Sequence, residues 1–253
     1  MKKVVLTLSL LLVLAVSMFS ITGKEVLDKV KDVHDNFKNE KSLVSMNLVD
    51  ANGNSRERIF DMYLMKKGED TLAMVRFNKP SEVKRITLLT LSDDEIYLYM
   101  PAYRKTKRIS GGAKNGNFVG SDLKFSDISL LYNEQSGSYK ANLLEEKDKM
   151  YKVEILPEDK DSDYGRIVAE IQKENMLITK VEFYNLKNEH IKTMVFSNIK
   201  NFDGHVLATH IELKDLKAKH STILDIKTVD FDLPFTAKFF NKMSISKPVL
   251  KYR

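Results

Sequence analysis

Cysteine and tryptophan are absent from this chain of 253 residues, and glycine and proline are scarce, with 10 and 5 residues. Without cysteine there is no disulfide scaffold, thiolate zinc site, iron–sulfur cluster or thiol nucleophile. Anchoring through an acylated cysteine is excluded as well. The chain is 43% hydrophobic and 30% charged, so it has enough apolar material for a core and its length suits a single domain.

The N-terminal segment is typical of a secretory signal peptide. Residues 1–3 are Met-Lys-Lys, and residues 4–19 are almost entirely apolar. This apolar run is shorter than the roughly 20 residues that a membrane-spanning helix needs, and small and polar residues follow it. We therefore expect residues 1–20 to be a signal peptide and residues 21–253 to form one periplasmic domain, with an uncleaved membrane anchor as the alternative.

The formal net charge of +6 includes the two lysines of that segment. Their removal leaves a weakly basic chain in a compartment where nucleic acid is not an expected ligand. We predict no nucleic-acid partner.

The spacing of apolar residues predicts one helix followed by a long antiparallel meander. Residues 22–39 carry apolar side chains at intervals of three and four, and Thr22 and Glu25 can form a capping box. From residue 42 the period changes to two, and the pairs Asn52-Gly53 and Asp203-Gly204 are typical of tight hairpin turns. Further helices are predicted at 121–136 and 234–243, the latter started by Pro234. Strands are predicted at 42–49, 56–65, 71–77, 85–91, 95–100, 103–110, 139–144, 150–156, 166–172, 177–185, 190–199, 206–214 and 221–229.

The fold class follows from this order of elements. Crossover helices are missing, which excludes a parallel sheet. We predict a mainly β fold, an unclosed antiparallel barrel (half-barrel) of about eleven to thirteen strands with about three short helices covering its concave face. The strands at 72–75 and 86–89 are apolar on both faces, so something must cover a second face. Helices lying in the mouth of the curved sheet could do so, and such a mouth can also hold a ligand.

The glycine-rich stretch 111–120 predicts a mobile loop that could act as the hinge of a lid. It lacks the Gly-Lys-Ser/Thr ending of a phosphate-binding loop. The following Ser121 and Asp122 are interpreted as caps of the second helix in preference to catalytic groups.

Catalytic and metal-binding motifs are missing from the sequence. There is no HExxH among the five histidines and no GxSxG, so we predict no enzyme activity, no cofactor and no metal. The spacing of Asp159, Asp161, Asp163 and Glu170 resembles a calcium loop, but Gly165 falls one place late, so a solvated acidic turn is favoured.

One dense basic cluster precedes the glycine-rich stretch. It consists of Arg104, Lys105, Lys107 and Arg108 on a predicted strand. It is interpreted either as the solvated edge of a sheet or as a contact for a lipid headgroup or partner protein.

Several stretches together resemble the outer-membrane lipoprotein-sorting protein family of LolA-like bacterial proteins. The resemblance covers nearly the whole chain after the predicted leader. It is carried by Pro80 followed by Ile86–Leu89, and by Ile96–Ser110, Phe118–Leu123 with Asp127, Tyr164–Arg166, Ile178–Tyr184, Lys192-Thr193 and Ala208–Glu212.

The resemblance implies an unclosed antiparallel barrel whose hydrophobic concavity is covered by helices, in a periplasmic protein that binds acyl chains or lipid-anchored polypeptides. Relatives of this fold also act as lipid carriers, exporter accessories and envelope-stress sensors. The founding carrier uses a strand arginine to hold its lid. Arg56 or Arg58 occupies a comparable second strand here, but the sequence does not align either of them to the carrier's arginine, so no lock residue is carried over.

We therefore predict a non-enzymatic periplasmic carrier or chaperone, a monomer that binds lipoprotein or lipid acyl chains and exchanges them with inner- and outer-membrane transport partners. An envelope sensor or exporter accessory on the same scaffold is the alternative, and a hydrolase using Asp122 or Asp127 comes third. The apolar candidates for lid and cavity, each of which could equally be ordinary core, are Leu123, Phe125, Ile128, Leu131, Phe235, Phe239, Met74 and Leu88.

Overall fold

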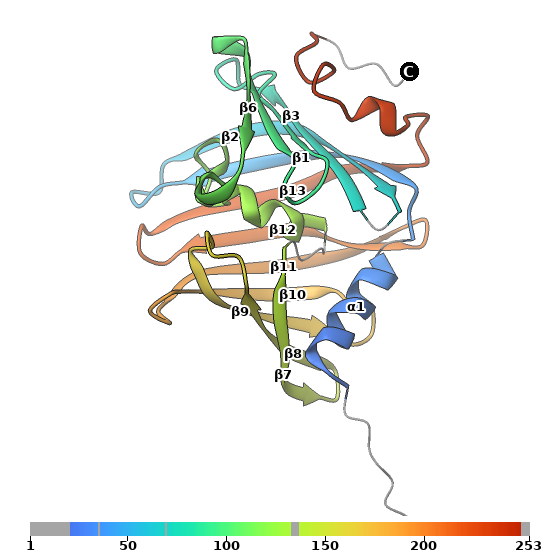
Figure 1. The fold of residues 1–253 in the computed structure, drawn as a ribbon, viewed down its shortest axis with the longest axis vertical. Coiled ribbons are helices and arrows are strands. Elements are labelled where there is room, and N and C mark those ends of the chain that lie inside the picture. Colours follow the sequence, from blue (N-terminus) through green and yellow to red (C-terminus); the bar gives the residue numbers. More distant parts are fainter. Residues whose placement is uncertain (1–20, 35, 69, 133–136, 249–253) are drawn as a thin grey trace, which may run out of the picture.

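The computed structural model describes residues 21–34, 36–68, 70–132 and 137–248, so the predicted signal peptide lies outside the described residues. One helix, α1 (Gly23–His34), precedes a single sheet of thirteen antiparallel strands (Figure 1). The strands are β1 (Asn39–Val49), β2 (Ser55–Lys67), β3 (Asp70–Lys79), β4 (Thr87–Thr90), β5 (Ile96–Met100), β6 (Lys105–Ile109), β7 (Tyr139–Lys147), β8 (Met150–Pro157), β9 (Tyr164–Gln172), β10 (Ile178–Asn185), β11 (His190–Phe202), β12 (His205–Asp215) and β13 (His220–Phe231).

The strand order explains why the middle of the chain lies over the sheet. The order is β6-β5-β4-β3-β2-β1-β13-β12-β11-β10-β9-β8-β7, so the first and last strands pair at the centre and β6 and β7 form the two open edges. The connection between these edges must cross one face, and Figure 1 shows it in green in front of the strands. We call residues 110–132 the crossover segment and the face that it covers the concave face. The predicted unclosed antiparallel barrel is confirmed.

Helix α1 begins with the predicted capping box. The backbone N–H of Thr22 donates to Glu25 Oε2 over 2.6 Å, and the N–H of Glu25 donates to Thr22 Oγ1 over 3.2 Å. The helix packs on β7 and β8 and buries Val26 and Val30 in the concave core. It therefore covers one part of the concave face, while the crossover segment covers another.

The second and third predicted helices are 3-10 turns, and within the described ranges α1 is the only α-helix. The capping prediction for Ser121 and Asp122 is wrong: Ser121 Oγ donates to the carbonyl of Phe118, and the Asp122 carboxylate accepts a hydrogen bond from Thr222 on β13. Both side chains are thus occupied away from a helix N-terminus. The short 3-10 segments are η1 (Pro101–Tyr103), η2 (Gly111–Asn115), η3 (Phe118–Gly120), η4 (Phe125–Tyr132) and η5 (Ala237–Phe239).

Two separate cores explain the strands that are apolar on both sides. Side chains alternate across β3, so Ala73 and Val75 join the concave core while Leu72 and Met74 join a second core on the opposite, convex face. The second core is covered by the C-terminal segment, residues 233–248, and not by helices in the mouth of the sheet as the sequence suggested. In Figure 1 this segment, in red, lies beside β3.

Polar side chains of the sheet tie this C-terminal segment down. The buried guanidinium of Arg76 donates to the carbonyls of Lys247 over 2.8 Å and Pro248 over 3.0 Å. At the start of the segment, Asn39 accepts from the N–H of Leu233 and donates to its carbonyl. These bonds satisfy carbonyls that strand pairing does not reach, so the segment is a fixed part of the fold.

Candidate ligand-binding site on the concave face

The crossover segment is held on the sheet by a buried ammonium group. Lys192 of β11 is only 4% exposed. Its Nζ donates to the backbone carbonyl of Asp122 over 2.7 Å, to Asp127 Oδ2 over 3.0 Å and to the Tyr164 hydroxyl over 3.0 Å. All three donor positions of the ammonium group are thus used, which is what burial of a charge requires.

The partners of Lys192 are themselves fixed. Asp127 Oδ2 also accepts from the N–H of Lys124 and from the Tyr164 hydroxyl, at 2.9 and 3.1 Å. Burial and the neighbouring Asp127 carboxylate raise the pKa of Tyr164 well above its ordinary value, so its hydroxyl stays neutral. Thr222 of β13 donates to Asp122 Oδ2 over 2.8 Å. This polar cluster connects the crossover segment to β9, β11 and β13.

Residues of three stretches that carry the family resemblance meet in this cluster. Asp122 and Asp127 come from the crossover segment, Tyr164 from β9 and Lys192 from β11. Sequence reasoning did not assign Lys192 or Tyr164 to a site, because neither has a local motif. Both residues stand in stretches that carry the family resemblance, and this was the only sequence signal that pointed to them.

The two arginines considered as lid holders occupy different places. Arg58 lies under the crossover segment, since a Cβ placed on Gly120 would come within 3.7 Å of Arg58 Nη2. Burial lowers the pKa of Arg58 from its ordinary value. Arg56, near the start of β2, is exposed. Among the described residues, Lys192 and Thr222 make hydrogen bonds that fasten the crossover segment to the sheet, and neither arginine does.

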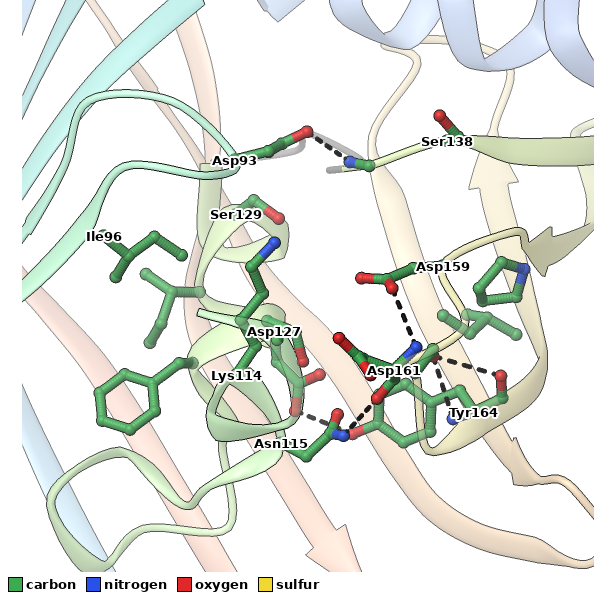
Figure 2. Close-up of a pocket in the computed structure, with 18 of the residues that line it drawn as sticks. Asp93, Ile96, Lys114, Asn115, Asp127, Ser129, Ser138, Asp159, Asp161 and Tyr164 are labelled. Atoms are coloured by element: carbon green, nitrogen blue, oxygen red, sulfur yellow. Dashed lines mark hydrogen bonds between the residues drawn. The ribbon is translucent and has the colours of Figure 1, made fainter. Parts of the chain in front are cut away.

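A small cavity lies between the crossover segment and β9 (Figure 2). Its volume is about 100 Å³, and Ile96, Phe125 and Ile128 form part of its apolar wall. Figure 2 shows polar groups on its other sides, including Ser129, whose buried Oγ has no hydrogen-bond partner among the described residues. We call this space the crossover cavity.

A larger cavity of about 240 Å³ lies beside the C-terminal end of α1. We call it the helix cavity. Its lining is mainly apolar and comes from β1, β2 and β11–β13 as well as the crossover segment, but it also includes the carboxyl group of Glu40. The apolar lining residues are Val33, Phe37, Met62, Leu64, Leu131, Phe196, Val206, Leu207, Ala208, Ile211, Ile226 and Phe231. Its volume far exceeds the roughly 10–15 Å³ that one water molecule occupies on the same measure.

The predicted lid and cavity residues divide between the two faces. Leu88, Leu123 and Ile128 are buried in the concave core, and Phe125 and Leu131 pack against it. Phe125 also lines the crossover cavity, and Leu131 lines the helix cavity.

Met74, Phe235 and Phe239 lie instead in the convex core, where the Phe235 and Phe239 rings are 5.3 Å apart. The prediction that these three residues belong to the lid and cavity of the concave face is therefore corrected. The sheet separates them from the concave face, because Met74 and Leu88 occupy opposite sides of adjacent strands.

The basic cluster lies on the open edge of the sheet. Arg104, Lys105, Lys107 and Arg108 are exposed on or beside β6, as the solvated-edge interpretation expects. Arg108 donates to the carbonyl of Asp94 over 2.8 Å. A headgroup or partner contact at this edge stays a prediction.

The acidic stretch near residue 160 forms a turn in which the Asp159 carboxylate accepts from the N–H of Asp161 over 2.9 Å. Among the described residues, no three His, Cys, Asp or Glu side chains form a group that could hold a metal ion. None of the helices in the described ranges is both long and apolar enough to cross a membrane.

Comparison with solved structures places this architecture among known folds. A candidate outer-membrane lipoprotein-sorting protein domain from Vibrio parahaemolyticus is 26% identical, with a TM-score of 0.81 over 89% of this chain and 98% of that one. A DUF1329 family protein from Desulfovibrio piger is 23% identical, with a TM-score of 0.78 over 88% and 97%. A LolA superfamily protein from Nitrosomonas europaea is 19% identical, with a TM-score of 0.69 over 88% and 99%. The fold is LolA-like.

A family model described as that of an uncharacterized protein matches residues 69–247. The chain belongs to this family. No curated protein matches the chain. The chain thus shares its fold with the lipoprotein-sorting protein domain and the LolA superfamily protein, and the region matched by the family model includes the crossover segment and every member of the polar cluster.

Proposed function

We propose that this protein carries acyl chains of lipoproteins or lipids in the helix cavity, without covalent chemistry. The observation that carries the proposal is a cavity of about 240 Å³ with a mainly apolar lining on the covered concave face of a LolA-like sheet. Each buried CH₂ contributes about 0.8 kcal/mol to binding, so an acyl chain of ordinary length would be held tightly. Tight binding then requires a means of release.

The crossover segment provides that means in this proposal. It contributes Leu131 to the helix cavity and is fastened to the sheet by the polar cluster around Lys192. Displacing the segment would expose the bound chain to a donor or acceptor partner, and the segment would close again when its hydrogen bonds re-form. The glycines at its start are the proposed hinge.

The cellular setting belongs to the same proposal. Residues 1–20 act as a signal peptide, and residues 21–253 work as one monomeric periplasmic domain that exchanges cargo with inner- and outer-membrane partners. The exposed basic residues of β6 are the proposed contact for a partner or headgroup. Cell fractionation with N-terminal sequencing tests this setting. The protein should be found in the periplasmic fraction without residues 1–20, and a cytoplasmic protein that still begins with Met1 would contradict the proposal.

Native mass spectrometry with lipid extraction tests the carrier function. The protein purified from a bacterial envelope should carry an acyl-containing molecule. Ala208→Phe, which fills the helix cavity, should reduce the bound fraction at least about tenfold, because the added ring occupies the ligand's space. Ala102→Phe on the exposed η1 turn is the matched control and should leave it unchanged. A wild-type protein that carries no lipid and binds no acyl probe contradicts the proposal.

A further inference from the structure

One carboxyl group, that of Glu40, lies among mainly apolar side chains in the helix cavity. Glu40 of β1 is 5% exposed and lines the cavity. Its Oε1 accepts a hydrogen bond from Ser42 Oγ two residues along the strand. Its strand neighbours across the ladders are Leu64 and Phe231, which both line the cavity. Within the described ranges, no basic side chain forms an ion pair with it.

The other ionisable groups around the cavity are engaged elsewhere. His34 of α1 bonds to the carbonyl of Met176, and His205 of β12 bonds to Asn36 and stacks on Phe231. Glu174, between β9 and β10, accepts a hydrogen bond from Gln172, while Lys66 of β2 bonds to Thr71 and lies over the ring of Phe37. None of these contacts compensates a negative charge on Glu40.

An uncompensated carboxyl group in such a site favours its neutral form. Burial raises the pKa of Glu40 to about 7, against a single opposing hydrogen bond from Ser42. The neutral acid has one O–H donor, whereas the carboxylate has none. A buried donor that faces a ligand cavity needs an acceptor, and the polar end of an acyl chain supplies one as the carbonyl oxygen of its ester or amide.

We propose that Glu40 is a specificity-determining residue of the helix cavity, where its protonated carboxyl group donates a hydrogen bond to the carbonyl oxygen of an acyl ester or amide. This inference rests on the proposed acyl-binding function and adds the chemical group that is recognised. Ionised Glu40 cannot make this bond and would leave two acceptors facing each other, so the ligand is bound by the neutral form.

Competition binding tests the inference. N-phenyl-1-naphthylamine reports occupancy of the cavity by fluorescence, and monolaurin, an uncharged acyl ester, displaces it. Only the neutral form binds, so the apparent dissociation constant for monolaurin should be about 30-fold larger near pH 8.5 than near pH 5.5. Glu40→Gln keeps an N–H donor at every pH, so its affinity should stay close to the low-pH wild-type value throughout.

Glu57→Gln is the matched control. Glu57 of β2 accepts a hydrogen bond from Ser45 as Glu40 does from Ser42, but it is exposed and outside the cavity. This variant should keep the wild-type pH dependence. If wild type binds both molecules with no pH dependence, or if Glu40→Gln keeps the dependence, the inference is overturned while the carrier function stands. If wild type binds neither molecule at either pH, the carrier function itself fails.

Discussion

Replacing Lys192 with methionine should destabilise the protein more than the same replacement of an exposed lysine does. Methionine keeps an apolar stem of similar length but has no donor, so the Asp122 carbonyl, the Asp127 carboxylate and the Tyr164 hydroxyl each lose a hydrogen bond from Nζ. Lys192 is 4% exposed and Asp127 is 1% exposed, so water cannot replace the lost donor. Removing one partner of a buried ion pair costs about 3–5 kcal/mol, and we expect Lys192→Met to lower the free energy of unfolding by that amount.

Urea unfolding followed by far-UV circular dichroism measures this loss. The double variant Lys192→Met with Asp127→Asn separates the ion pair from the packing of the stem. Asparagine at 127 leaves no unpaired charge, so the double variant should recover about 1–3 kcal/mol relative to the sum of the single losses.

Lys152→Met supplies the control for removal of a lysine from a strand. Lys152 pairs with Glu170 at 3.6 Å, with side chains that are 31% and 24% exposed. Such a solvated pair contributes about 0–1 kcal/mol. If Lys192→Met loses no more than this control, or if the double variant shows no coupling, the description of Lys192 as the fastening of the crossover segment is refuted.

Three further predictions concern other parts of the fold. Because burial raises the pKa of Glu40 from 4.5 to about 7, folding favours the neutral acid, and the free energy of unfolding should fall by about 3 kcal/mol as the pH rises from 4.5 to 7. Glu40→Gln should remove this pH dependence, which urea midpoints measured across the range report. Phe239→Ala should cost about 3–5 kcal/mol in urea unfolding without changing acyl-probe binding, and lost binding at unchanged stability would contradict its place in the convex core. Gly165→Ala should cost about 1–3 kcal/mol in thermal unfolding, since the new Cβ would lie 2.8 Å from the Asn185 carbonyl oxygen, and an unchanged melting temperature would argue against this close approach.

The sequence predicts the meander well because its signals are local. The hairpin turns at Asn52-Gly53 and Asp203-Gly204 are present, and Gly53, Asp203 and Gly204 have positive φ values of 83°, 52° and 95°. Glycine and aspartate tolerate this left-handed region of backbone conformation. The capping box of Thr22 and Glu25 is likewise an interaction within one turn of helix, and it is confirmed.

The misplaced elements depend on contacts between distant residues. Ser121 and Asp122 have the residue types of helix caps, but the hydroxyl of Thr222, one hundred residues away, takes the Asp122 carboxylate. The alternation along β3 shows that both faces are buried, yet it does not tell which segment covers which face. The sequence prediction for Phe235 and Phe239, which assigns them to the concave face, is therefore wrong. The cavity lining was missed for the same reason, since Glu40, Leu64 and Phe231 become neighbours only through strand pairing.

The two halves of the sheet hold the crossover segment by different forces. On β3 the contact is apolar: Phe118 of the crossover packs on Phe77 with ring centroids 5.6 Å apart, and Phe77 packs on Phe60 of β2. The half of the sheet that contains β2 and β3 is covered on both faces, so it is the more rigid of the two halves. On β11 the contact is the hydrogen-bonded ammonium group of Lys192. Apolar packing is non-directional and tolerates small displacements, whereas buried charge-assisted hydrogen bonds are lost within about an ångström. Opening should therefore begin at the β11 side, while the aromatic contact on β3 keeps the part of the crossover segment next to its glycine hinge in place.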